Sequence, residues 1–247
     1  MENYIIGITT FSKRFNYLDK LISQIRSFSD NKIIITVNGE SDGNFDEDYR
    51  VSVLNLCTKY VNIYPTFYLE IRGLSKLWNT ILINSCETNV LMLNDDIEIR
   101  SGEIFKITSS LINSTTFSGL TKMNNSFSHF VVSKKLMCDV GYFDERLLGF
   151  GEEDGDITYR LLKLGIVIGG VHVGGVVNIV SNVRHDEVKS GIGKYSLFNR
   201  DFIYKEKYLV DMSSKYKGMF DTPMGQKLPD INSYPCEKFF MENKDRL

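Results

Sequence analysis

The sequence predicts an α/β domain with a mixed, mainly parallel β-sheet flanked by helices. Short β-branched or apolar runs at residues 4–9, 32–37 and 90–93 are typical of buried strands. Between the first two runs, apolar residues recur at helical spacing, at Phe15, Leu18, Leu21, Ile22, Ile25 and Phe28. A strand, a helix and a strand in this order favour a parallel sheet that is covered by helices.

The rest of the first half continues the alternation. The expected elements are a loop at 10–14, a polar turn-rich loop at 38–43, a helix at 51–59, an extended segment at 61–69 and a helix from about 72 to 84. Leu77, Trp78, Ile81 and Leu82 would form the apolar side of that last helix.

In the second half, the strand at 90–93 runs directly into Asn94-Asp95-Asp96. The expected elements that follow are a helix at 103–112, a strand at 130–133, a loop at 141–145, a helix at 152–164 and two short strands within 165–180. We expect one domain over residues 1–210. Residues 211–247, which hold three of the four prolines, form a C-terminal extension.

Composition and charge exclude several functions. The formal net charge of -2 and the isoelectric point near 6.0 argue against a nucleic-acid partner, which usually needs a basic surface. Cys57, Cys86, Cys138 and Cys236 form no C-x-x-C pair, so neither a zinc site nor a disulfide framework is expected. Free thiols, and no targeting or membrane-spanning segment, favour a cytoplasmic location, with membrane association left open.

Two polar segments lie where a parallel sheet binds ligands. In such sheets the ligand site lies beyond the carboxyl ends of the strands. The loops at 10–14 and 38–43 follow two of the predicted strands directly. They are therefore candidate site loops before any family is considered.

Asn94-Asp95-Asp96 is the first acidic motif. Two carboxylates at the end of a buried strand are costly unless water or a cation solvates them. Oxygen ligands suit Mg²⁺ or Mn²⁺, which often bridge a few carboxylates and a diphosphate. The alternative is a simple turn, because Asn and Asp are common turn formers.

A second acidic motif, Glu152-Glu153-Asp154-Gly155-Asp156, opens the predicted helix at 152–164. Four carboxylates in five residues repel one another, and a raised pKa among them suits a general base. The alternative is a solvated helix start, where the helix dipole favours acids. His185 is a further candidate metal ligand, whereas His129 and His172 lie in apolar strand contexts that favour a structural role.

Taken in order, these segments resemble the GT-A fold (Rossmann-like) glycosyltransferases, especially glycosyltransferase family 2 and the galactosyltransferase-like C-terminal halves. The resemblance covers most of residues 4–210. The matching segments are Ile8-Thr9-Thr10-Phe11, the helix start from Gly73 to Asn79, Asn94-Asp95-Asp96 for the D-x-D signature, Val140 to Glu145, Gly151 to Asp156 with Arg160, and Asn199 to Tyr208. Each motif alone is common, but this order and spacing are specific.

The resemblance implies metal-dependent, inverting transfer of a sugar from a nucleotide sugar, expected to be UDP-linked, to a glycan or lipid-linked acceptor. Asp96 and His185 would hold Mn²⁺ or Mg²⁺, and Asp154 would be the catalytic base. The implied acceptor-binding residues are Glu153, Gly151 and Phe150. The implied donor-binding residues are Thr9, Thr10, Asn38, Arg72, Lys76, Asn79, Asn94 and Asp95. Asn38 stands where the family usually has Asp.

Two other functions remain open. A sugar-1-phosphate nucleotidyltransferase also uses metal-binding Asp on an α/β sheet, but its Gly-rich first loop has no counterpart at residues 9–14. A non-catalytic GT-A-like binding subunit is compatible with Asn38 and Asn94. A homodimer remains open too, as does peripheral membrane contact through the Lys- and aromatic-rich residues 198–216. By fold-level analogy, the expected role is surface polysaccharide or glycolipid assembly.

Overall fold

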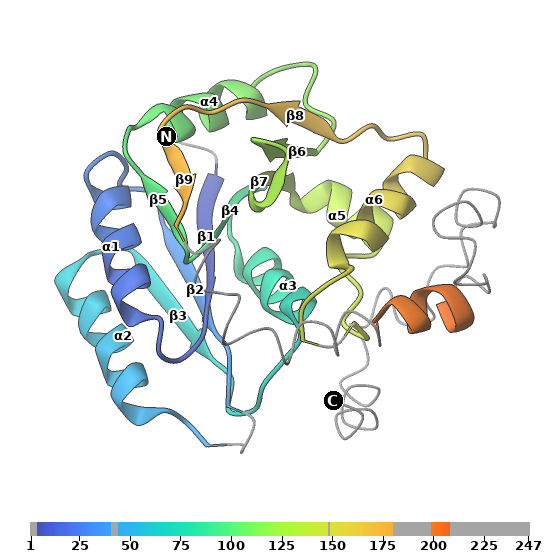
Figure 1. Cartoon of the computed structure of the whole chain (residues 1–247). Helices are drawn as coiled ribbons and strands as arrows, with labels where there is room; N and C mark the ends of the chain where they lie inside the picture. The colour runs from blue at the N-terminus through green and yellow to red at the C-terminus, as the bar shows by residue number, and fades with distance from the viewer. Residues whose placement is uncertain (1–3, 41–43, 148, 180–198, 208–247) are drawn as a thin grey trace. The chain divides into compact units, whose positions relative to one another are not determined.

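The computed structural model describes residues 4–40, 44–147, 149–179 and 199–207, which fall into two compact units (Figure 1). Of these residues, 4–40, 44–72, 77–136 and 169–179 form the first unit. The second unit contains residues 73–76, 137–147, 149–168 and 199–207. The predicted extension at 211–247 lies outside the described residues.

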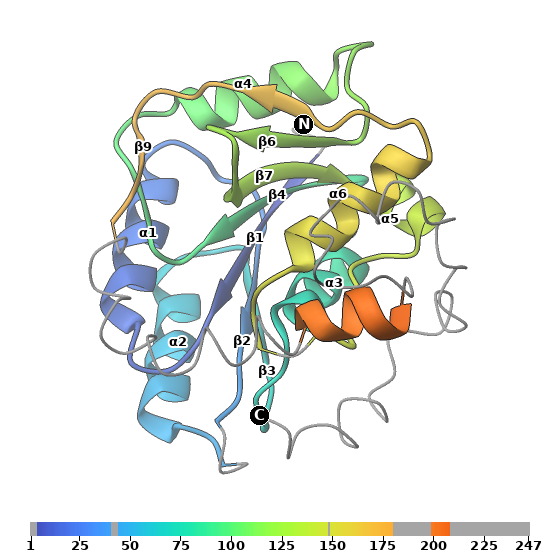
Figure 2. The ribbon, with the colours of Figure 1, turned by 45° about the vertical axis from the view of Figure 1, so that its right-hand side comes forward.

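A seven-stranded sheet with the order β3-β2-β1-β4-β7-β6-β8 organises the first unit (Figure 2). Its strands are β1 (Tyr4–Thr10), β2 (Ile33–Val37), β3 (Ile63–Phe67), β4 (Asn89–Asn94), β6 (Leu120–Met123), β7 (Ser126–Ser133) and β8 (Gly169–Val171). The pairs β1–β2, β2–β3, β1–β4 and β6–β8 are parallel. β7 is antiparallel to both β4 and β6. The sheet is therefore mixed and mainly parallel, as the sequence predicts.

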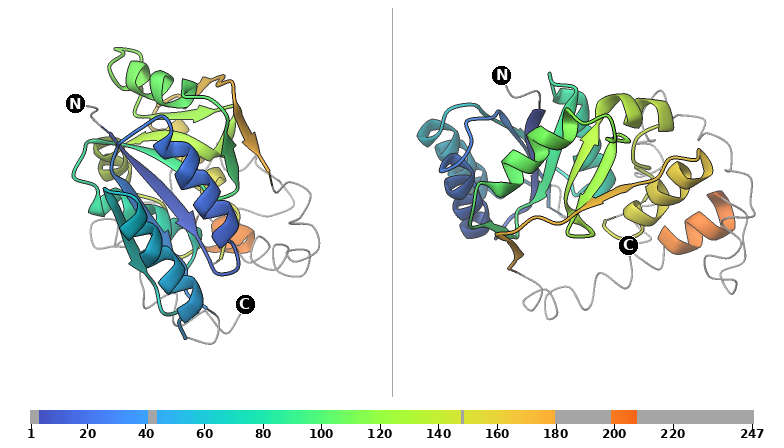
Figure 3. Two further views of the ribbon diagram at one scale, coloured as in Figure 1. Left: turned by 90° about the vertical axis from the view of Figure 1, so that its left-hand side faces the viewer. Right: turned by 90° about the horizontal axis from the view of Figure 1, so that it is seen from above.

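Helices cover both faces of this sheet. Buried side chains of α1 (Phe15–Arg26), α2 (Glu47–Lys59) and α4 (Glu103–Ile112) form one apolar cluster with Ile6 and Ile8 of β1. Figure 3 shows α1 and α2 side by side. Gly7 points to the opposite face, because side chains alternate along a strand. A Cβ atom on Gly7 would collide with Ile81 of α3 (Leu74–Asn84), so this glycine lets α3 approach the sheet closely.

The structure adds elements that the sequence pattern did not predict. They are β5 (Ile97–Ile99), which pairs antiparallel with β9 (Val176–Asn178), together with β6, the first half of β7 and α5 (Lys134–Val140). The start of β7 alternates Ser with Phe and His, so it carries little apolar signal. α2 begins at Glu47, four residues before the prediction, because the Asp46 side chain caps it by accepting from the Tyr49 N–H at 3.0 Å.

The second unit contains the end of α5, α6 (Glu153–Lys163) and the π-helical segment η1 (Phe202–Lys207). Its buried apolar side chains include Phe143, Leu147, Ile157, Leu161, Phe202 and Ile203. Among the described residues, no helix is both long and apolar enough to cross a membrane.

Candidate functional site

The carboxyl ends of the parallel strands bring the predicted donor-side segments to one edge of the sheet. Thr10 is in register with Val37, and Val37 with Phe67, while Thr9 is in register with Asn94. The strand order reverses between β1 and β4, because β2 and β3 lie on one side of β1 and β4 lies on the other. Such a reversal point is where open α/β sheets bind ligands. Asp95 and Asp96 follow β4 directly at this point.

Arg14 holds Asp95 from the loop after β1. Arg14 Nε lies 2.8 Å from Asp95 Oδ2, and Arg14 Nη2 lies 2.6 Å from Asp95 Oδ1. The Thr10 hydroxyl donates to Asp95 Oδ2 at 2.8 Å, and Thr10 Oγ1 lies 2.6 Å from the Tyr49 hydroxyl. The Arg14 guanidinium also lies over the rings of Phe11 and Tyr17, at 4.8 and 5.4 Å. Both oxygens of Asp95 are therefore engaged within the protein.

Burial and charge set the protonation states of this group. Burial lowers the pKa of Arg14, but the hydrogen bonds and negative charges of Asp95 and Asp96 outweigh it and raise that pKa above its usual value. Burial raises the pKa of the Tyr49 hydroxyl, which therefore stays neutral. The site thus contains a permanent guanidinium beside two carboxylates.

The two strand-end carboxylates differ in how well they fit a metal ion. Asp95 does not fit, because Arg14 and Thr10 bind both of its oxygens. Asp96 fits better, because Arg14 contacts it less closely, with 3.3 Å between Arg14 Nη2 and Asp96 Oδ2 against 2.6 Å to Asp95 Oδ1. Within the described ranges, no three or more His, Cys, Asp or Glu residues are grouped to hold a metal ion. His185 lies outside those ranges. A cation at Asp96 would take further ligands from phosphate oxygens, as Mg²⁺ sites often do.

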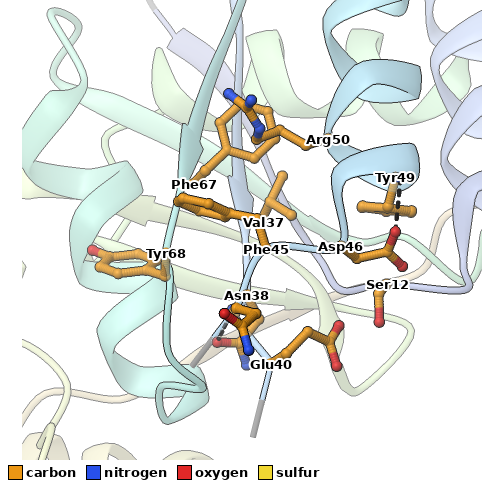
Figure 4. Close-up of a pocket in the computed structure, with 12 residues that line it drawn as sticks. Ser12, Val37, Asn38, Glu40, Phe45, Asp46, Tyr49, Arg50, Phe67 and Tyr68 are labelled. Atoms are coloured by element: carbon orange, nitrogen blue, oxygen red, sulfur yellow. Dashed lines mark hydrogen bonds between the residues drawn. The ribbon is translucent and has the colours of Figure 1, made fainter. Parts of the chain in front are cut away.

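A pocket of about 250 Å³, counting the part open to solvent, adjoins the ends of β2 and β3 (Figure 4). The aromatic side chains of Phe45, Phe67 and Tyr68 line it, together with the carboxylates of Glu40 and Asp46. Phe45 also stacks under the Arg50 guanidinium, 5.5 Å from its ring centre. Flat aromatic walls beside acceptor groups suit a planar ring that carries N–H donors.

Asn38 lies in this pocket, but the backbone fixes its side chain. Asn38 Oδ1 accepts from the N–H groups of Arg72 and Gly39, at 2.8 and 3.0 Å. Asn38 Nδ2 donates to the Arg72 carbonyl at 3.0 Å. The two bonds to Arg72 tie the end of β2 to the segment after β3. The amide orientation is therefore determined by its backbone partners.

The other predicted donor-side residues are dispersed. Thr9 is buried on β1, and Asn79 is fully buried in α3. Arg72 Nη1 lies 3.4 Å from Glu70 Oε2. Lys76 belongs to the second unit, where its Nζ lies 3.1 Å from Glu145 Oε2. Arg14 is not among the residues predicted from the sequence, because nothing in the sequence distinguishes it from its neighbour Lys13 in the same loop.

The second acidic motif forms the start of α6 in the second unit. Glu153 is buried, and the Gly151 N–H reaches both of its carboxylate oxygens, at 2.9 and 2.7 Å. Burial raises the pKa of Glu153 to about 8, and the charges of Asp154 and Glu152 add to that rise. Asp154 is exposed and accepts from the Gly155 N–H at 2.9 Å. Phe150, which precedes the turn, is 39% exposed. A neutral acid and an accessible carboxylate therefore stand side by side.

Comparison with solved structures identifies the fold. A mannosyltransferase from Pyrobaculum calidifontis, solved with GDP-Man and Mn²⁺, matches with a TM-score of 0.59 and 11% identity over 73% of this chain. Glucosyl-3-phosphoglycerate synthase from Mycobacterium tuberculosis, solved with Mn²⁺ and UDP, matches with a TM-score of 0.55 and 11% identity over 79% of this chain and 77% of its own. GalNAc-T7, solved with UDP, GalNAc and Mn²⁺, matches with a TM-score of 0.57 and 10% identity over 98% of this chain.

These matches confirm the predicted GT-A glycosyltransferase fold. This chain spans 57% of the mannosyltransferase and 56% of GalNAc-T7. No protein-family model matches the sequence, and no curated protein matches it either.

The Arg14–Asp95 pair gives a first prediction. Replacing Arg14 with Met leaves a buried carboxylate without its main partner, which typically costs about 3–5 kcal/mol of unfolding free energy. Urea denaturation should show this loss for Arg14→Met. Arg100→Met is the matched control, because Arg100 pairs with Glu98 at an exposed position in the same unit. Equal denaturation midpoints for the two variants would contradict the structural importance of the pair.

The raised pKa of Glu153 gives a second prediction. The unfolded carboxyl ionises near 4.5, whereas the folded one keeps its proton up to about pH 8. The contribution of Glu153 to the free energy of unfolding is therefore fully present below pH 4.5. It is lost as the pH rises to 8, at up to about 1.4 kcal/mol per pH unit. In denaturation series between pH 5 and 8, Glu153→Gln should remove this slope, whereas Glu47→Gln, at an exposed site, should keep it. A Glu153→Gln series parallel to the wild type would refute the assignment.

Proposed function

We propose that this chain is an inverting, metal-dependent glycosyltransferase that moves a hexosyl group from a UDP-linked sugar to a hydroxyl of a glycan or lipid-linked acceptor. The observation that carries the proposal is Asp154, an accessible carboxylate at the start of α6 beside the buried Glu153, in a chain with the GT-A fold. The nucleotides and Mn²⁺ in the three solved structures support the donor class and the cation.

On the donor side, Asp96 and His185 would hold the cation, Mn²⁺ or Mg²⁺. When bound, it would neutralise negative charge on the leaving diphosphate. Asn94 and Asp95 would lie near the ribose and diphosphate, with Arg14 fixing Asp95 in place. The remaining proposed donor contacts are those of Thr9, Thr10, Asn38, Arg72, Lys76 and Asn79. The aromatic pocket beyond β2 and β3 would accept the base.

On the acceptor side, Asp154 would take the proton of the acceptor hydroxyl. The hydroxyl oxygen then bonds to the anomeric carbon from the face opposite the diphosphate, and the bond from that carbon to the diphosphate oxygen breaks, which inverts the configuration. Glu153 is unsuited to this step at neutral pH, because its pKa near 8 keeps it protonated. Its O–H would instead donate to the acceptor, beside Gly151 and Phe150.

Asp154→Asn tests this assignment. Removing the base should lower kcat by about 10²- to 10⁴-fold, the usual contribution of general-base catalysis. Binding of UDP with Mn²⁺, measured by calorimetry, should stay unchanged because the base does not contact the nucleotide. Asp139→Asn changes another exposed carboxylate of the second unit and should leave both quantities as in the wild type. Full activity of Asp154→Asn would exclude it as the base.

A donor screen separates the remaining functions. Hydrolysis of UDP-, GDP-, CMP- and dTDP-sugars with Mn²⁺ would identify the donor and support a transferase. Pyrophosphate released from a nucleoside triphosphate and a sugar phosphate would identify a nucleotidyltransferase instead. If neither reaction occurs and no nucleoside diphosphate with Mn²⁺ raises the melting temperature, a binding subunit is the better description.

A further inference from the structure

Residues 199–207 hold both flanks of the acidic turn that starts α6. Before Glu153, Asn199 Nδ2 donates to the Gly151 carbonyl at 2.7 Å. Arg200 Nη2 lies 2.9 Å from Glu152 Oε1. After Asp154, Lys207 Nζ forms an ion pair with Asp156 Oδ1. Because these anchors lie on either side of Glu153-Asp154, they limit how far the turn can move.

Lys207 is a buried anchor that contacts two carboxylates. Its side chain is 1% exposed, and its Nζ also lies 2.9 Å from Asp144 Oδ2. The side chains of Asp144 and Asp156 are both fully buried. Burial alone would raise the pKa of Asp144, but the positive charges of Lys207 and Arg146 lower it below its usual value. A buried charge is tolerated only with close partners, so Lys207 fixes the separation of the two carboxylates.

Two arginines complete this buried network. Arg146 Nε lies 3.0 Å from Asp144 Oδ1, and Arg160 Nε lies 3.0 Å from Asp156 Oδ2. Asp156 uses Oδ2 for Arg160 and Oδ1 for Lys207. Asp144 shares its Oδ2 between Lys207 and Arg146, whose Nη2 lies 3.1 Å from it. Arg160 also donates to the carbonyls of Val140 and Tyr142, at 2.7 and 2.6 Å. Lys207 links the two arginine–aspartate pairs, because its Nζ contacts both carboxylates.

The turn itself is strained, which makes external anchors important. Glu152, the residue before α6, has a φ of +76°, a left-handed conformation that is unfavourable for a residue with a side chain. Such strain persists only when surrounding contacts enforce it. Arg200 contacts the Glu152 side chain, and Asn199 contacts the preceding carbonyl. Without these contacts the turn would relax and carry Asp154 with it.

We propose that Lys207 is a positioning residue for sugar transfer. It acts through Asp156 and the first turn of α6 to hold Asp154 in its reactive place. Asn199 and Arg200 fix the other flank of the turn. The proposal rests on Asp154 as the base. A reactive group must be held within about 0.5 Å of its working position. The short buried link from Lys207 to Asp156, two residues from Asp154, provides such a restraint.

Lys207→Met tests the proposal against Lys205→Met, a control in the same segment whose exposed Lys205 only pairs with Asp201 at 3.0 Å. With the donor that the screen identifies, kcat of Lys207→Met should fall about 10- to 100-fold at unchanged donor KM, the size of loss that follows a displacement near 1 Å. Lys207→Arg should restore part of kcat.

Hydrogen exchange of the amides at 151–156 separates this proposal from the proposed function. Faster exchange in Lys207→Met than in Lys205→Met supports the anchor, even if Asp154→Asn proves active and the base must be sought elsewhere. Unchanged exchange, or an unchanged kcat, overturns the positioning role. If Lys207→Met does not fold, Arg200→Gln replaces it, since the Arg200 side chain is 41% exposed. If Arg200→Gln has the same exchange and the same kcat as Lys205→Met, the positioning role is also overturned.

Discussion

The bond between Arg14 and Asp95 is the interaction on which the strand-end site depends. It joins the loop after β1 to the end of β4, the two strands between which the sheet order reverses. A carboxylate at that position cannot stay ionised in a buried setting without a partner. Because Arg14 is part of the protein, it fixes the loop after β1 without a bound ligand. This edge of the sheet therefore holds one guanidinium and two carboxylates in fixed positions.

The second unit also contains buried carboxylates, and it neutralises them with a larger group of cations. Asp144 and Asp156 are fully buried, and three cationic side chains surround them, of which Lys207 contacts both. Asp156 belongs to the acidic turn itself, and Lys207 and Arg160 bind its carboxylate. Asp154 itself stays exposed, and Glu153 avoids the cost of burial by keeping its proton. Glu153, Asp154 and Asp156 are close in sequence but differ in burial and in the groups that contact them.

Local patterns were enough to predict the strands that position the site. The runs at 4–9, 32–37 and 90–93 are short and apolar, and parallel pairing then places their ends together. Helical spacing also places four residues of α6 on one buried face: Glu153, Asp156, Ile157 and Arg160. This spacing can be read from the sequence. It would have distinguished buried Glu153 from exposed Asp154.

Long-range pairing could not be predicted in this way. Lys13 and Arg14 are equivalent in the sequence, but Lys13 adopts a φ of +67° and is exposed, whereas Arg14 turns inward to a carboxylate 81 residues away. Only the fold decides which of the two cations is buried. The pairing of Lys207 with Asp156, 51 residues apart, also depends on the fold. The polar start of β7 could not be predicted either, because it has no apolar periodicity.

The fixed amide of Asn38 restricts which edge of a ligand can meet it. Its oxygen already accepts from two backbone N–H groups, and one hydrogen of Nδ2 goes to the Arg72 carbonyl, so only the second Nδ2 hydrogen is left for another acceptor. At this position the pocket can therefore recognise a carbonyl oxygen or a ring nitrogen lone pair, but not an N–H. Aspartate would be no substitute, because one of its oxygens would face the Arg72 carbonyl. A base with an imide edge must find its acceptor elsewhere in the pocket, where Glu40 and Asp46 carry the carboxylates.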